Sequence, residues 1–368
     1  MKKNISSFII SLILLAVPLS TVLVPVASAQ SRYSSRNYSQ NSWSNHNGGS
    51  RSGGGQTTPP VTPVTPPVVT PPPVVPVVPV TPPVVVTPPV VVTPPPATTT
   101  PPATTASALQ WGAYVGDGAS AMSDLETLVG KKMNIYADFE GFDATFPTQF
   151  SSTVGQQGKT LLIFWEPSTG LASIANGSLD ASIKQFAAGA KAYGYPVILA
   201  PFDEMNLNET SWGYGQNGNT PAQFIAAWRH IHDLFAGDTN VKFALDYNNV
   251  SIPSASDNTY ASFYPGASYV DYVGVDGYNF GNPWQSFSQV FSGAINEASQ
   301  FGKPIYILAT ASAPGAQKAT WISQGLGTLS TTYPNVKGWV WFDVNKEADW
   351  RVNSDSTSLT AFKSVLPN

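Results

Sequence analysis

The chain has 368 residues, so it is long enough for one large domain with additional segments. Its formal net charge is −4. This weakly acidic balance gives no reason to expect a nucleic-acid partner. The sequence contains no cysteine, which excludes disulfides and thiolate metal sites. Of its histidines, His46 lies in a low-complexity stretch, and His230 and His232 lie in a helical pattern. We therefore expect neither a metal ion nor a cofactor.

Residues 1–29 have the pattern of a secretory signal peptide. Lys2 and Lys3 precede an apolar run over 8–26, which ends in Ala27-Ser28-Ala29. We predict cleavage after Ala29 and a secreted, extracellular protein. Because the apolar run is long for a signal, an uncleaved membrane anchor is the alternative, and it would leave the protein associated with the cell surface.

Two segments of biased composition follow. Residues 30–56 are rich in Ser, Asn, Gly and Arg and contain no acidic residue, so they are predicted to be disordered. This basic stretch could contact an anionic cell wall, although a passive spacer is the simpler interpretation. Residues 57–105 repeat Thr-Pro-Pro-Val-like units, a composition that favours a polyproline II linker. Its predicted role is to hold the following domain at a distance.

Residues 106–368 have the composition of a globular domain, in which short apolar runs alternate with amphipathic stretches. The predicted strands are Leu109–Tyr114, Met133–Asp138, Thr160–Trp165, Pro196–Phe202, Val241–Tyr247, Tyr272–Val275, Pro304–Leu308 and Gly338–Phe342. Predicted helices include Leu179–Tyr193, Pro221–Phe235, Trp284–Phe301 and Gln317–Thr331. Eight strands that alternate with helices predict a (β/α)₈ barrel. A doubly wound open sheet is the alternative, but no Gly-rich phosphate loop follows an early strand.

In such barrels the active site lies at the C-terminal ends of the strands. Carboxylates, amides and aromatic residues follow the predicted strands, as in Asp138-Phe139-Glu140, Phe164-Trp165-Glu166, Asp203-Glu204-Met205-Asn206, Asp246-Tyr247-Asn248, Asp276-Gly277-Tyr278-Asn279 and Trp341-Phe342-Asp343. These are the groups that stack on sugar rings and bind sugar hydroxyls. A single Asp at a strand end is more often a turn former, and a single Trp is more often part of the core.

From about Gln110 to the C-terminus the sequence resembles glycoside hydrolase family 26, whose best-known members are retaining endo-β-1,4-mannanases. The matching pieces occur in family order. They are Phe164-Trp165-Glu166-Pro167, Pro201-Phe202-Asp203-Glu204-Met205-Asn206, Trp212-Gly213, Thr220-Pro221, Ala227-Trp228-Arg229-His230-Ile231-His232, Tyr264-Pro265-Gly266, Val270-Asp271-Tyr272-Val273-Gly274, Asp276-Gly277-Tyr278-Asn279, Lys303-Pro304-Ile305, Trp341-Phe342 and Asp349-Trp350-Arg351.

The resemblance implies that Glu204 is the general acid/base, which protonates the departing glycosidic oxygen and then activates water. It further implies a set of substrate-binding residues around it. In this set Tyr278 lies near the nucleophile, Trp212 and Trp341 are sugar platforms, Trp165 and Trp284 are further candidates for the cleft, and Asp203 and Asn206 flank the acid.

The sequence departs from the family pattern at the position of the catalytic nucleophile. After Lys303-Pro304 the chain runs without a gap into Ala309, where family members have the nucleophilic Glu. A methyl group cannot form the covalent glycosyl intermediate, so the retaining route is predicted to be closed. Two further changes accompany it, because Asp203 replaces a His and Ala200 replaces an Arg.

Three hypotheses remain open at this point. The barrel binds β-linked polysaccharide, of the mannan type in the first instance, with little or no hydrolysis. Alternatively it is an inverting β-glycanase, in which Asp276 serves as a substitute base and Glu140, Asp203 and Asp246 are the other candidates. The third hypothesis is a surface scaffold or adhesin, for which aromatic residues of the cleft would be buried. No oligomerisation signal is present, so a monomer is expected, and the sequence does not name the sugar.

Overall fold

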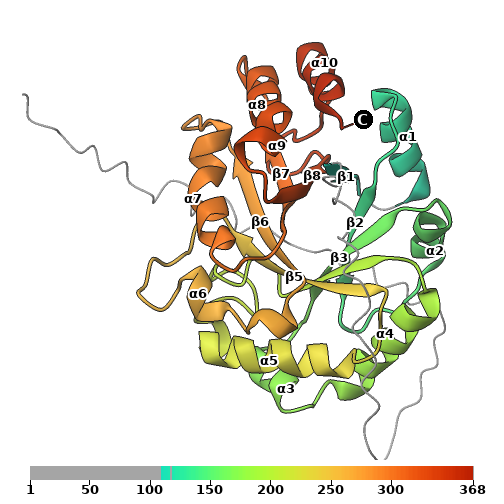
Figure 1. Cartoon of the computed structure of the whole chain (residues 1–368), viewed down its shortest axis with the longest axis vertical. Coiled ribbons are helices and arrows are strands. Elements are labelled where there is room, and N and C mark those ends of the chain that lie inside the picture. Colours follow the sequence, from blue (N-terminus) through green and yellow to red (C-terminus); the bar gives the residue numbers. More distant parts are fainter. Residues whose placement is uncertain (1–108, 117, 368) are drawn as a thin grey trace, which may run out of the picture. The chain divides into compact units, whose positions relative to one another are not determined.

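The computed structural model describes residues 109–116 and 118–367. The predicted signal peptide, the 30–56 segment and the 57–105 linker lie outside these residues. Within them, eight parallel strands close into a barrel in the order β1 to β8, and helices surround it (Figure 1). The predicted (β/α)₈ barrel is therefore confirmed, and the open sheet is excluded.

Every predicted strand is present, with shifted ends. The strands are β1 (Gln110–Tyr114), β2 (Ile135–Gly141), β3 (Thr160–Glu166), β4 (Val197–Pro201), β5 (Val241–Asn248), β6 (Tyr272–Asn279), β7 (Ile305–Ser312) and β8 (Val336–Phe342). The α-helices are α1 (Ala119–Val129), α2 (Gln149–Gln156), α3 (Leu171–Ala175), α4 (Asp180–Tyr193), α5 (Pro221–Leu234), α6 (Tyr260–Phe263), α7 (Phe287–Ser299), α8 (Lys318–Gly325), α9 (Leu329–Thr332) and α10 (Ser356–Val365). The 3-10 turns are η2 (Gln216–Gly218), η3 (Ala267–Tyr269) and η4 (Leu326–Thr328).

Local sequence explains where the helices begin. Thr220 caps α5 through a capping box with Gln223, and Pro221 is the first helical residue, as the sequence predicted. Ser286 and Gln289 form the same box at α7. The predicted helix over 317–331 is instead divided into α8, η4 and α9.

Side chains of the strands alternate between the barrel interior and the surrounding helices. Trp165 of β3 contacts Phe186 of α4, which places it on the outer side, so Phe164 points inward. On β6, a Cβ atom added to Gly277 would meet Phe291 of α7, so Gly277 also faces the helices. Asp276 and Tyr278, its neighbours in the same strand, therefore point into the barrel.

A β-bulge interrupts this alternation in β7. Val275 of β6 pairs with Ile307, but the next residue, Asp276, pairs with Ala309, so Leu308 is an extra residue. The Leu308 side chain reaches over Gly274, where a Cβ atom would lie 2.4 Å from it. Both Leu308 and Ala309 are thereby directed towards the interior. The bulge also carries β7 and its pairing beyond the predicted end at Leu308.

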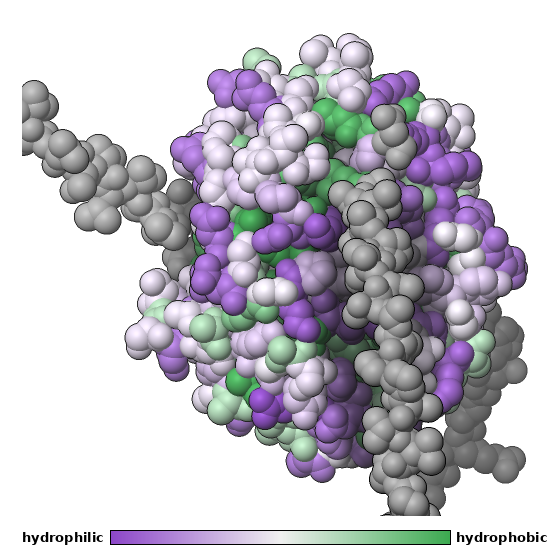
Figure 2. Space-filling model, viewed as in Figure 1, coloured by the Kyte–Doolittle hydropathy of each residue, from purple (hydrophilic) through white to green (hydrophobic). Residues whose placement is uncertain are grey.

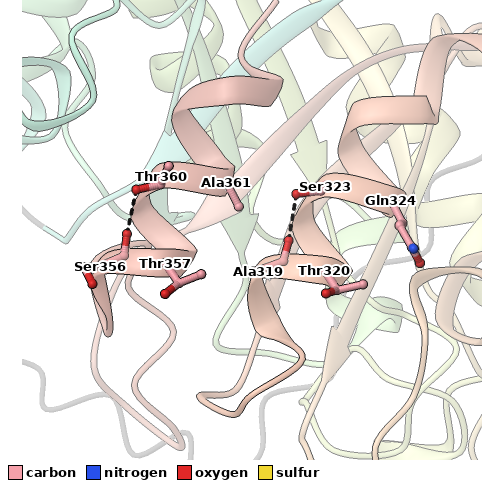
Figure 3. Close-up of a pocket in the computed structure, with 8 residues that line it drawn as sticks. All are labelled: Ala319, Thr320, Ser323, Gln324, Ser356, Thr357, Thr360 and Ala361. Carbon is pink, nitrogen blue, oxygen red and sulfur yellow. Dashed lines mark hydrogen bonds between the residues drawn. The ribbon is translucent and has the colours of Figure 1, made fainter.

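The outer surface of the described residues is largely polar. Figure 2 shows apolar colour in separate patches among hydrophilic residues, and the exposed large hydrophobic side chains of the described part are Tyr195 and Val250. Between α8 and α10 lies a groove of about 570 Å³, lined by small and hydroxyl-bearing side chains that include Thr320 and Thr357 (Figure 3). No helix over 109–116 and 118–367 is long and apolar enough to cross a membrane.

Candidate active site

Glu204 lies in a turn that directly follows β4. Phe202 and Glu204 both have left-handed backbone conformations, with φ of 62° and 52°. Such conformations cost a residue with a side chain about 1–3 kcal/mol, and they persist where the surroundings enforce them. Here the Glu204 N–H donates to the Asp246 carbonyl of β5 over 3.1 Å. The turn bends the chain as soon as the strand ends and brings the buried Glu204 carboxylate towards β5.

Two buried asparagines hold this carboxylate in place. The Asn248 side-chain amide donates to Glu204 Oε1 over 2.8 Å. The backbone N–H of Asn248 in turn donates to Asn206 Oδ1 over 2.9 Å, and Asn206 Nδ2 donates to the Asn248 carbonyl over 2.9 Å. Asn206 is fully buried, and its Nδ2 also donates to the Val250 carbonyl over 3.1 Å. It therefore supports the site from behind, whereas the sequence placed it among the substrate-binding residues.

The strands next to Glu204 bring further polar groups to the same level. Asn248 of β5 pairs in register with Asp276 of β6, and Asp276 pairs with Ala309 of β7. In-register neighbours of a sheet point to the same side, so these three side chains form an inward-facing row. Ala309 is 3 % exposed and contributes only a methyl group to this row. The carboxylate adjacent to the predicted nucleophile position is therefore that of Asp276.

The hydroxyl of Tyr260 is buried and lies near several acids. Burial raises its pKa well above the ordinary value, and the charges of Glu297, Asp246, Asp276 and Glu204 raise it further. Three of these acids are Glu204 in the turn after β4, Asp246 of β5 and Asp276 of β6. All three therefore act electrostatically on the buried Tyr260 hydroxyl. Glu297 belongs to α7 in the helix layer, where it accepts from the Tyr260 N–H, so it is not part of the barrel interior.

Beside the acids, five inward-facing rings form what we call the aromatic wall: Tyr114, Phe139, Phe164, Tyr278 and Phe342. Tyr114 stacks on Phe342 with a centroid separation of 5.0 Å, and Phe139 stacks on Phe164 at 4.6 Å. Tyr278 meets Phe342 edge-on at 5.9 Å across the intervening β7. Tyr114 and Phe139 are half-buried, so part of the wall is open to solvent.

The structure corrects one predicted sugar platform, Trp341, and one further cleft candidate, Trp165. Trp165 and Trp341 are each 0 % exposed. Trp165 packs against Phe186 of α4, and Trp341 packs against Trp321 of α8 and Phe362 of α10. A fully covered ring has no face on which a sugar can stack. Sequence reasoning preferred tryptophan, but the strand alternation turns Phe164 and Phe342, their immediate neighbours, towards the interior.

The remaining predicted residues have different surroundings. Trp212 is almost buried, and its Nε1 donates to the Asp203 carbonyl over 2.8 Å, so it supports the turn that carries Glu204. Asp203 is itself buried in this turn. Trp284 is half-buried over Gly315 in the β7–α8 loop, at the barrel rim. Glu140 pairs with Trp165, which faces the helices, so it shares the outer side and does not join the other acids.

No three His, Asp or Glu side chains of the described ranges gather so as to hold a metal ion. The barrel interior thus combines the Glu204, Asp246 and Asp276 carboxylates with the aromatic wall. The sequence model of glycosyl hydrolase family 26 matches residues 144–357, which is more than half of the chain. The chain belongs to glycosyl hydrolase family 26.

Curated family relatives are named for two kinds of activity. Endoglucanase H of Acetivibrio thermocellus is 38% identical over 276 residues, a match that covers 71% of this chain and 30% of the relative. A mannan endo-1,4-beta-mannosidase of Bacillus subtilis is 31% identical over 104 residues, with 27% of this chain and 29% of the relative covered. The chain thus spans less than a third of the length of either relative.

Solved structures share the barrel fold of family 26. An endo-β-1,4-mannanase from Cellulomonas fimi aligns with a TM-score of 0.55 at 15% identity, over 70% of each chain. The catalytic domain of a mannanase from Bacillus sp. JAMB-750 aligns with a TM-score of 0.54 at 15% identity, over 70% of this chain and 85% of that chain. At this identity the likeness concerns the fold alone.

Proposed function

We propose that this family 26 barrel binds a β-linked polysaccharide and that it lacks the retaining hydrolysis of its relatives. One observation carries the proposal: Asn248 holds Glu204, the expected acid/base, whereas the β7 position of the expected nucleophile bears the methyl group of Ala309. The aromatic wall supports binding, because aromatic faces pack on the apolar faces of pyranose rings. Retaining hydrolysis requires a second carboxyl group that forms the covalent intermediate.

The choice of sugar is guided by the relatives. The resemblance in sequence favoured mannan, whereas the relative matched over most of the barrel is named an endoglucanase. We therefore propose β-1,4-glucan and β-1,4-mannan as the two ligand classes to compare. Both backbones present alternating ring faces to an aromatic surface, and they differ in the orientation of one hydroxyl group.

The test is a combined binding and cleavage screen of the full-length protein. Cello-, manno- and xylo-oligosaccharides are titrated by calorimetry, and the same mixtures are followed by NMR for new reducing ends and their anomeric form. We expect saturable binding of at least one series and no product of retained configuration. Turnover with retention would contradict the proposal, and absence of binding to every series would favour a scaffold role instead.

A second candidate function is inverting hydrolysis, favoured by the position of Asp276. This carboxylate is the in-register neighbour of Ala309, where a water molecule could stand in place of the missing side chain. Asp276 would take a proton from that water as it attacks the anomeric carbon, and Glu204 would protonate the leaving oxygen. In the NMR screen this route gives products of inverted configuration, and Asp276→Asn would abolish them.

We also propose that the barrel acts outside the cell, as a monomer. The basis for export is the sequence pattern of residues 1–29. Residues 30–56 would contact the cell wall, and residues 57–105 would be the spacer that holds the barrel away from it. Mass spectrometry of the protein from culture medium and from cell envelopes tests this. A mature chain that begins at Gln30 in the medium supports secretion, and an intact N-terminus in the envelope supports the anchor.

A further inference from the structure

Lys318 opens α8 and is fully buried. Its ammonium group donates to the Arg351 carbonyl over 2.8 Å and to Ser354 Oγ over 2.9 Å. It is also within hydrogen-bond distance of the carbonyls of Asp349 and Trp350, at 3.3 and 3.4 Å. All four acceptors belong to the segment that joins β8 to α10, which we call the β8–α10 loop (343–355). A single side chain thus holds this loop from the helix layer.

A charged lysine is unfavourable at this position for two reasons. Burial of an ammonium group costs several kcal/mol unless hydrogen bonds and opposite charges compensate it. A cation in the first turn of a helix is also disfavoured by the helix dipole. The charged groups that face Lys318 are Asp343, Asp349, Asp355 and Arg351, all in the loop and its helix cap. The hydrogen bonds from the Lys318 ammonium group to the backbone of the β8–α10 loop therefore explain why a lysine lies here.

The loop held in this way carries Trp350. The carbonyl of Trp350 also accepts from Trp341 Nε1 over 2.9 Å, and its N–H donates to the Val344 carbonyl over 3.0 Å. Asp343 Oδ1 accepts from the Val352 N–H two residues further on. The backbone on both sides of Trp350 is consequently anchored, and Lys318 is the anchor that links it to α8.

The indole of Trp350 supports the aromatic wall from behind. Its ring lies 5.4 Å from that of Tyr278 and 5.3 Å from that of Phe280. Tyr278 is the wall residue on the same strand and the same inward side as Asp276. A displacement of Trp350 would leave the Tyr278 ring without this packing partner. The Tyr278 ring, which a sugar beside Asp276 would contact, would then be free to move.

Building on the proposed glycan-binding function, we propose that Lys318 is a positioning residue, which fixes Trp350 and through it sets the Tyr278 face of the sugar site. It does not touch the ligand. Trp341 donates to the same Trp350 carbonyl from the outer side of β8, so it helps to hold Trp350 without contacting the ligand.

The test compares Lys318→Met with the native full-length chain. The oligosaccharide that binds the native protein is titrated by calorimetry, at a temperature where circular dichroism shows both proteins folded. We expect at least a tenfold weaker affinity for the variant. Lys184→Met is the matched control, because Lys184 is an exposed helix lysine paired with Asp180, and its affinity should equal the native value. Native affinity in Lys318→Met would overturn the proposal.

Two further measurements separate positioning from general stability. Lys318→Ala removes the side chain beside a solvent-accessible pocket of about 330 Å³ that Ser354 and Ala319 line. Added n-propylammonium should restore affinity to Lys318→Ala at least fivefold, whereas n-propanol should not. Equal effects of both additives would contradict a role for the ammonium group.

The second measurement does not depend on a ligand, and so distinguishes failure of this inference from failure of the proposed function. Trp350→Phe identifies the contribution of Trp350 to the near-ultraviolet circular dichroism spectrum. We expect Lys318→Met to lose that same contribution while its far-ultraviolet spectrum stays native. An unchanged Trp350 signal in Lys318→Met would refute the positioning role even if no glycan binds.

Discussion

At the scale of single residues, the molecule combines a buried carboxylate at the predicted acid/base position with a methyl group at the predicted nucleophile position. The Glu204 turn keeps two left-handed residues and a buried amide network around one carboxylate. The opposing strand supplies a methyl group at Ala309. Strained turns persist when the surrounding structure enforces them. Here the turn places Glu204 beside Asn248, which belongs to the inward-facing row of Asn248, Asp276 and Ala309. Binding and catalysis can therefore be separated by substitutions at these two positions.

Ala309→Glu should create retaining hydrolysis. The new carboxylate would stand in the inward row beside Asp276 and supply the covalent intermediate that the native chain cannot form. We expect release of reducing ends to rise at least about 100-fold, because nucleophilic catalysis replaces one difficult step by two easier ones. NMR would show products of retained configuration. Ala309→Gln, of equal size, should stay inert, and activity in both variants would point to another mechanism.

Glu204→Gln should preserve binding. The amide oxygen of Gln can accept the hydrogen bond that Asn248 Nδ2 now gives to Glu204 Oε1. Oligosaccharide affinity by calorimetry is expected to stay within tenfold of the native value, which is about 1.4 kcal/mol. Complete loss of binding would mean that the charge of Glu204, rather than the aromatic wall, provides most of the affinity.

At the scale of secondary-structure elements, a buried ion pair joins α1 to the barrel. Glu126 of α1 accepts from Lys159 Nζ over 2.5 Å and from the Met133 N–H over 2.9 Å, and both acidic and basic side chains are buried. Burial acts to raise the pKa of Glu126, but hydrogen bonds from Lys132 and Lys159 outweigh it, so the pKa is lowered. The pair therefore contributes stability above the ordinary Glu pKa, and loses it as the pH falls through the lowered value.

Glu126→Gln should destabilise the protein by about 3–5 kcal/mol, because it leaves the ammonium of Lys159 buried without its counter-charge. Urea unfolding at pH 7 measures the loss. The double variant Glu126→Leu with Lys159→Met removes both charges and should recover most of it. If the double variant were as unstable as Glu126→Gln, packing at this corner, and not the unpaired charge, would be the cause.

At the scale of the whole molecule, burial disfavours two charges at the junction of α8 and the β8–α10 loop, Lys318 in α8 and Asp343 in the loop. Burial raises the pKa of Asp343 to about 6 and lowers the pKa of Lys318 to about 8. Asp343 thus contributes stability that is fully present below its ordinary pKa of 3.8 and lost as the pH rises through 6. Lys318 contributes stability that is present above 10.5 and lost as the pH falls through 8. Between pH 6 and 8 the fold holds both charges at a cost, which their role in holding the loop offsets.

Asp343→Asn should raise the free energy of unfolding at pH 7.5 by up to about 3 kcal/mol, since each pKa unit corresponds to about 1.36 kcal/mol. Asn keeps an oxygen that can accept the Val352 N–H. The gain should disappear below about pH 3, where the native carboxyl is protonated in both the folded and unfolded states. Urea unfolding at several pH values checks this, and a gain of equal size at every pH would exclude the titration of Asp343 as its source.

Much of this architecture could be predicted because it depends on local pattern. Eight apolar runs at regular spacing predicted the eight strands of the barrel, and Thr220-Pro221 predicted the start of α5. Glu204 and Ala309 were identified from linear motifs around each of them. The residues of the aromatic wall that were missed include Phe139, which lies outside the family motifs, and Phe342, which lies in the Trp341-Phe342 motif beside the tryptophan that was chosen instead.

The sequence by itself determined the barrel, the presence of a carboxylate at Glu204 and the absence of one at Ala309, since each depends on residue identity and order along the chain. Only the tertiary structure decided which member of each neighbouring pair faces the site: Phe164 rather than Trp165, and Phe342 rather than Trp341. The reason is that strand alternation gives two equivalent sides until closure of the barrel and docking of the helices select one. The extra residue Leu308 then shifts that choice within β7.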